Sequence, residues 1–94
     1  MNANDLTLNI AVNLGRLSKW AIEGKTNRID QFLKETEVYL NQLENAEKSE
    51  QFNKTFSVFK QKFQDLKKNP ILNEVWAEEA LTWANILTHR AKLA

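Results

Sequence analysis

Apolar side chains recur every three or four residues in four successive segments of this chain, and this period restricts the fold more than any other feature. An α-helix turns once every 3.6 residues, so the spacing gathers the apolar side chains on one face. A chain of 94 residues has room for one small core, and we expect the richest of these faces to be buried in it. That face is a phenylalanine stripe formed by Phe52, Phe56, Phe59, Phe63 and Leu66.

Each segment has residues that can begin or end a helix. The first is expected to start at Asn4 or Asp5, whose short side chains can cap a helix, and to end at Gly24, which adopts the left-handed conformation readily. The second is expected to open at Thr26 or Asn27. The apolar faces of these two segments are Leu6, Ile10, Leu14, Leu17 and Ala21, and then Ile29, Phe32, Leu33, Thr36, Tyr39, Leu40 and Leu43.

The third segment is expected to be capped by Ser49 and to end at Asn69-Pro70. Proline disfavours a helical residue before it but suits a first helical turn, so the fourth segment should run from about Ile71 to near Ala91. The whole chain has only two glycines and one proline, which is typical of long helices joined by few turns.

Short connections between helices of this length favour antiparallel neighbours. The sequence therefore predicts an all-α fold, a small up-down-up-down four-helix bundle that forms a single helical domain over residues 1–94. In the alternative, the first two segments merge through Gly24 into one long helix, and the resulting extended helical hairpin needs a partner to complete it.

The first and fourth segments carry more apolar surface than one core face requires. On a wheel of 100° per residue, the apolar positions of the fourth segment cover about 240° of arc, whereas a surface helix usually shows little more than 100°. Ala11 and Gly15 are small and four residues apart, so another backbone could approach closely there. The resulting candidate protein interface consists of Leu8, Ala11, Val12, Gly15, Ile22, Ala77, Leu81 and Ala84.

The residues of common active sites are largely missing. The chain has no cysteine and a single histidine, His89, so it lacks the paired ligands of common metal sites. It also has no glycine-rich loop of the kind that binds phosphate. Glu79 is the one carboxylate inside an apolar arc, and we interpret it as a boundary or interface residue. We therefore expect no enzymatic activity, no catalytic residues, no cofactor, no metal and no small-molecule substrate.

The formal net charge is +1, so no strong overall field attracts nucleic acid or anionic lipid. In an up-down bundle, however, one end would collect an excess of basic residues. The candidate nucleic-acid contacts at that end are Lys25, Arg28, Lys67 and Lys68.

The sequence shows no secretory signal pattern and no apolar run of about 20 residues, so we expect a cytoplasmic protein that does not enter a membrane. The first functional hypothesis is a non-enzymatic small helical protein that acts through protein–protein contacts, as a homodimer or a small subunit of a larger assembly. The alternative is a helical subunit of a ribonucleoprotein complex that binds the nucleic-acid backbone. No internal repeat or family motif favours either one.

Overall fold

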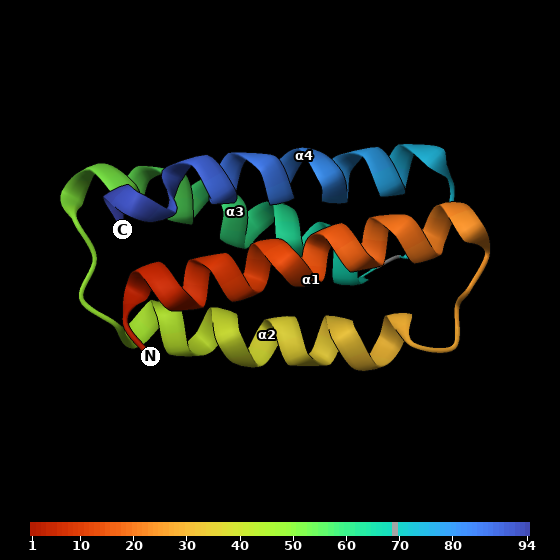
Figure 1. The fold of residues 1–94 in the computed structure, drawn as a ribbon, viewed down its shortest axis with the longest axis horizontal. Coiled ribbons are helices and arrows are strands. Elements are labelled where there is room, and N and C mark those ends of the chain that lie inside the picture. Colours follow the sequence, from red (N-terminus) through yellow and green to blue (C-terminus); the bar gives the residue numbers. More distant parts are fainter. Residues whose placement is uncertain (69) are drawn as a thin grey trace.

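Four α-helices form the fold in the computed structural model, which describes residues 1–68 and 70–94. They are α1 (Ala3–Glu23), α2 (Ile29–Asn45), α3 (Glu50–Lys68) and α4 (Glu74–Arg90), and a short 3-10 turn, η1 (Ala91–Leu93), follows α4. Each helix runs antiparallel to the one before it, and α1 packs against both α2 and α4 (Figure 1). The predicted four-helix bundle is therefore confirmed.

The long-helix alternative fails at Gly24. This residue has a φ of 72°, in the left-handed region, and it ends α1 through backbone hydrogen bonds back to the last turn. The chain then reverses, and α2 returns alongside α1 (Figure 1). The prediction that glycine ends the first helix is confirmed. All four helices of the bundle come from this one chain.

The predicted starts of three helices are displaced by one to three residues. In α1 the cap is Asn2, whose Oδ1 accepts a 2.8 Å hydrogen bond from the backbone N–H of Asp5, so Asp5 lies inside the first turn. The position before α2 is Arg28, which makes no side-chain cap. In α4 the cap is Asn73, whose Oδ1 accepts from the N–H of Trp76 at 2.9 Å.

The start of α4 shows why the proline rule was misleading. An asparagine three residues after Pro70 can satisfy a free N–H of the first turn, whereas a helix starting at Ile71 would place Asn73 inside it. Residues 70–73 therefore belong to the connection, and the predicted break at Asn69 lies outside the described residues. The cap of α3 is as predicted, since the N–H of Phe52 donates to Ser49 Oγ at 3.0 Å.

The phenylalanine stripe is buried, as predicted. Phe59 and Phe63 have no exposed surface, and the ring of Phe59 lies 5.4 Å from that of Trp83 on α4, centroid to centroid. Large aromatic side chains thus fill the space between α3 and α4. The four phenylalanines of the stripe are therefore covered within the chain.

Small side chains bring α1 and α4 close together. Ala11 on α1 and Ala77 on α4 are buried. Ser18 Oγ donates a buried 2.7 Å hydrogen bond to the backbone carbonyl of Ala77, and Asn4 Nδ2 donates to that of Ala91 at 2.8 Å. Side chains this short reach a neighbouring backbone only where the two helices are closely packed.

The wide apolar arc of α4 is therefore mostly used inside the chain. One side of α4 presents alanines to α1, and another presents tryptophans to the core beside α3. No helix in the part of the chain that the structure describes is long and apolar enough to cross a membrane.

Candidate functional site

Three of the eight predicted interface residues are buried. Ala11, Ala77 and Ala84 are 4%, 0% and 6% exposed, so they cannot contact a partner of the folded chain. The close backbone approach that Ala11 suggested does occur, but the approaching helix is α4 of the same chain. Helical spacing alone does not tell an internal neighbour from an external one.

The other five residues remain accessible, and we call them the outer α1–α4 face. Exposed fractions are 38% for Leu8, 52% for Val12, 64% for Ile22 and 46% for Leu81, and Gly15 is partly exposed. Leu8, Gly15 and Ile22 are spaced by seven residues, so they lie along one line of α1.

Leu81 lies level with the middle of that line. Two contacts fix the register of the antiparallel pair, because Ser18 meets Ala77 and Asn4 meets Ala91. Interpolation between these contacts places Leu81 level with Leu14, one residue from Gly15. The exposed residues of the two helices therefore lie at the same height along the bundle.

Gly15 has no structural role that the chain itself explains. A Cβ added at this position would meet no atom within 4 Å, and only Gly24 has a positive φ among the described residues. Glycine inside a helix is about 1 kcal/mol less favourable than alanine. The close approach of a second molecule is one physical reason to have glycine there.

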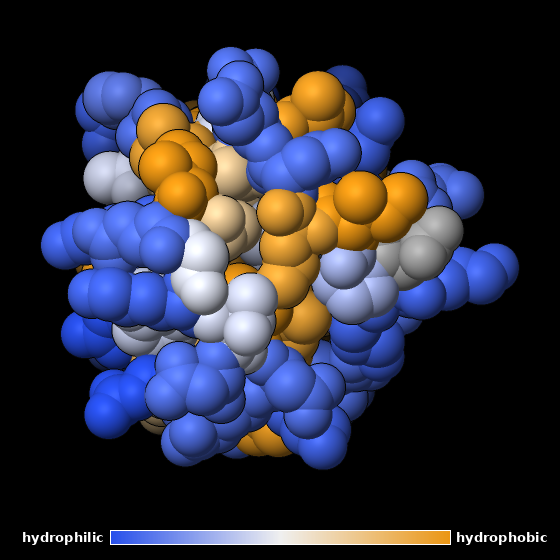
Figure 2. Space-filling view, turned by 90° about the vertical axis from the view of Figure 1, so that its right-hand side faces the viewer, coloured by the Kyte–Doolittle hydropathy of each residue, from blue (hydrophilic) through white to orange (hydrophobic). Residues whose placement is uncertain are grey.

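A second accessible apolar region lies at the end of the bundle that holds the α1–α2 and α3–α4 connections. Figure 2 looks onto this end and shows apolar surface near its middle with hydrophilic surface around it. The exposed apolar residues here include Ile71 at 60% and Val75 at 72%. Neither was predicted as a site residue, because both were expected to lie within the fourth helix, from about Ile71 to near Ala91.

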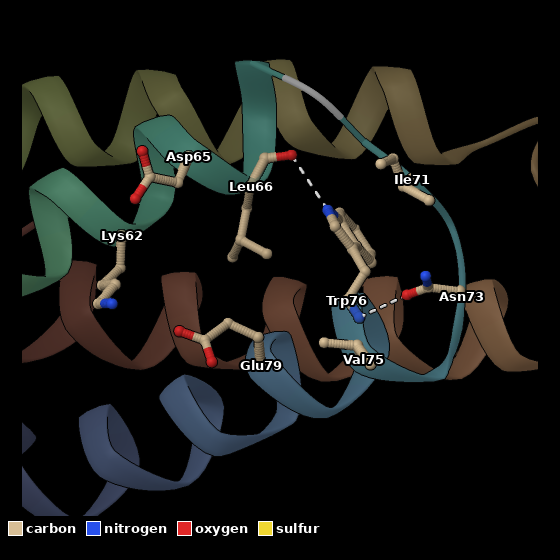
Figure 3. A pocket seen from close by; sticks show the side chains of 8 residues that line it. All are labelled: Lys62, Asp65, Leu66, Ile71, Asn73, Val75, Trp76 and Glu79. Carbon is tan, nitrogen blue, oxygen red and sulfur yellow. Dashed lines mark hydrogen bonds between the residues drawn. The ribbon is translucent and has the colours of Figure 1, made fainter.

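A pocket opens between the end of α3 and the start of α4 (Figure 3). Its volume is about 370 Å³. Trp76 forms part of the apolar lining, held by a 3.1 Å hydrogen bond from its Nε1 to the carbonyl of Leu66. The lining residues are Lys62, Asp65, Leu66, Ile71, Asn73, Val75, Trp76 and Glu79.

The predicted basic cluster is not brought together, although the topology is as expected. Lys67 pairs with Glu37, and Lys60 pairs with Glu44 at 2.5 Å. These pairs place the end of α3 level with the middle of α2. Arg28 precedes Glu37 by nine residues, about 13 Å along a helix, so Lys67 and Arg28 do not form one site.

The remaining members of that cluster are also separated or paired. Lys25 lies 3.6 Å from Glu23, nitrogen to oxygen, and Lys68 is exposed at the end of α3. Arg28 belongs to the α1–α2 connection. The structure thus offers isolated cations at this end, not a surface of four adjoining positive charges.

No group of three histidine, cysteine or acidic side chains converges in a way that could hold a metal ion within residues 1–68 and 70–94. His89 is exposed near the end of α4. Comparison of the chain with protein-family models, with curated proteins and with solved structures finds no match. The function is therefore inferred from the surface of the chain.

Proposed function

We propose that this chain is a non-enzymatic helical protein that acts through protein–protein contacts, as a homodimer or a small subunit of a larger assembly, and that the outer α1–α4 face is its contact surface. The observation that carries the proposal is Gly15. It lies in the middle of α1 with open space over it, between Leu8 and Ile22 and level with Leu81.

The composition of the face supports this use. The line from Leu8 through Gly15 to Ile22 is itself uncharged, but the exposed Lys19 lies beside it, one turn after Gly15, so a partner that covers the line must leave the Lys19 ammonium in water. A standard interface covers about 800 Å² on each partner, roughly one-seventh of the 5797 Å² surface of this chain. A partner seated on the outer face would therefore also cover its polar flanks.

The test replaces exposed apolar residues with arginine. Leu81→Arg or Val12→Arg should leave the fold intact, because both side chains are about half exposed, but should abolish association through this face. Val38→Arg is the matched control, since Val38 is 53% exposed on the polar side of α2. The measurements are mass in solution by light scattering and quantitative recovery of copurified protein.

The proposal fails if the parent chain is monomeric and if Leu81→Arg recovers the same copurified protein as the parent chain does. It also fails if Val38→Arg disrupts association as much as Leu81→Arg does. Binding to a nucleic-acid backbone, the alternative function, has less support because Lys67 is paired with Glu37 and lies apart from Arg28.

A further inference from the structure

We propose that the pocket between α3 and α4 receives a large apolar side chain, such as phenylalanine, from a protein partner that has a basic residue beside it in sequence. Val75 and Glu79 of α4 line this pocket, whereas Leu81 lies on the outer face. The inference is independent of the proposed contact through the outer α1–α4 face.

The apolar part of the pocket is largely uncovered. Val75, at 72%, is the most exposed large apolar side chain of the part of the chain that the structure describes, and Ile71 is 60% exposed. Both line the pocket together with the nearly buried Leu66. Covering Val75 and Ile71 removes apolar surface from water, which favours association.

The base of the pocket is formed before any partner arrives. The indole of Trp76 is 6% exposed and donates to the carbonyl of Leu66, and the backbone N–H of Trp76 donates to the Asn73 cap (Figure 3). These bonds fix the ring against the end of α3. A partner side chain would therefore meet a fixed surface, which limits the ordering that binding requires.

The charged lining favours a basic residue next to that apolar side chain in the partner's sequence. Lys62, Asp65 and Glu79 lie together on one side of the pocket, and Ile71 lies on the other (Figure 3). None of the three charged residues belongs to a salt bridge within residues 1–68 and 70–94. Two carboxylates against one ammonium leave an excess negative charge, so a cation is favoured there over an anion.

The size and form of the pocket fit a side chain presented by a partner. Its volume of about 370 Å³ is at the lower end of the range for small-molecule sites, and exposed residues stand at its edge. An apolar side chain can occupy the region near Val75 and Ile71. A following arginine or lysine can then reach Glu79 and Asp65.

Three capped dipeptides test this arrangement, namely phenylalanyl-arginine, phenylalanyl-glutamine and phenylalanyl-glutamate, each with acetyl and amide ends. Binding is followed by NMR through the indole N–H resonance of Trp76. The arginine peptide should bind most tightly and the glutamate peptide most weakly, with a ratio of dissociation constants of about three or more. Added salt should reduce that ratio, because exposed charges are screened.

Variants of the chain assign the preference to named charges. Glu79→Gln should reduce the ratio of the dissociation constants of the glutamate and arginine peptides, and Lys62→Gln should increase this ratio. Glu78→Gln is the control, because Glu78 is exposed and does not line the pocket, and it should leave the ratio unchanged. Val75→Ser should weaken all three peptides alike.

Two results would overturn the inference. One is equal binding of the three peptides, which would remove the charge selection. The other is no change of the Trp76 resonance with any peptide while the chain remains folded, which would remove the pocket as a side-chain site. Leu81→Arg should not affect these titrations, so failure here is distinguishable from failure of the outer α1–α4 face.

Discussion

Gly15 and Ser18, almost one turn apart on α1, show how differently two small residues are used. Ser18 is buried and its hydroxyl donates to the backbone of α4, so its size is required by packing within the chain. Gly15 is partly exposed, and a Cβ added there would meet no atom within 4 Å. Only Gly15 is therefore available to a partner.

Replacing Gly15 with alanine should therefore separate folding from association. In Gly15→Ala the free energy of unfolding should rise by up to about 1 kcal/mol, because the added Cβ meets open space and the helix loses a glycine. Association through the outer α1–α4 face should weaken if another backbone approaches there. Denaturant unfolding and light scattering measure the two effects.

The informative comparison is with Gly24→Ala. Gly24 has a φ of 72°, so alanine there is strained and should lower stability without changing association. If Gly15→Ala stabilises the chain and association is unchanged or stronger, no close backbone contact exists at Gly15.

The core at Phe59 gives a prediction of larger size. Phe59→Ala should lower the free energy of unfolding by about 3–5 kcal/mol, because it removes a fully buried ring that packs against Phe63 and Trp83. Val58→Ala, at the neighbouring and 52% exposed position, should cost much less. Thermal or urea unfolding checks both, and equal costs would contradict the assignment of the stripe to the core.

At the scale of the helix, lateral contacts between elements matter as much as the pattern within each one. Lys60 and Lys67 of α3 are seven residues apart and pair with Glu44 and Glu37 of α2, which are also seven apart. The two pairs set the register between the helices. A helical wheel places these lysines on a polar face but does not say which residues they meet.

Charge reversal should therefore affect Lys67 and Lys68 differently. Lys67→Glu sets a carboxylate beside the partly buried Glu37, and the free energy of unfolding should fall by about 1 kcal/mol. Lys68→Glu is at an exposed position and should change it by less than about 0.5 kcal/mol. Urea unfolding at low and high salt measures both, and a salt-independent loss in Lys67→Glu would contradict an ionic cause.

The architecture of the whole molecule was predictable because four amphipathic periods and few helix breakers leave one simple solution. The stripe from Phe52 to Leu66 could be assigned to the core for the same reason. Which residues of the predicted interface are buried and which are exposed could not be predicted from the sequence. Whether Ala11 or Val12 is covered depends on the distance and register between α1 and α4, which the hydrogen bonds of Ser18 and Asn4 reveal.

The pocket was missed for a related reason. It exists because Asn73 begins α4 late and leaves Ile71 in a connection beside the end of α3. Competition between Pro70 and Asn73 for the helix start decides that geometry, and sequence preference alone favoured the wrong residue. Glu79, by contrast, was singled out in the sequence by its place in an apolar arc, but the pocket that it lines was not predicted.

The hydrogen bond from Asn4 to Ala91 has one more consequence. It joins the beginning of α1 to the end of α4, and residues of both chain ends line the same shallow hollow, which includes Met1 and Ala94. Both ends lie at the side of the molecule away from the α3–α4 connection (Figure 1). The four helices therefore follow one another around the bundle as a nearly closed ring. The packing of the helices does not require the chain to begin with α1 and end with α4.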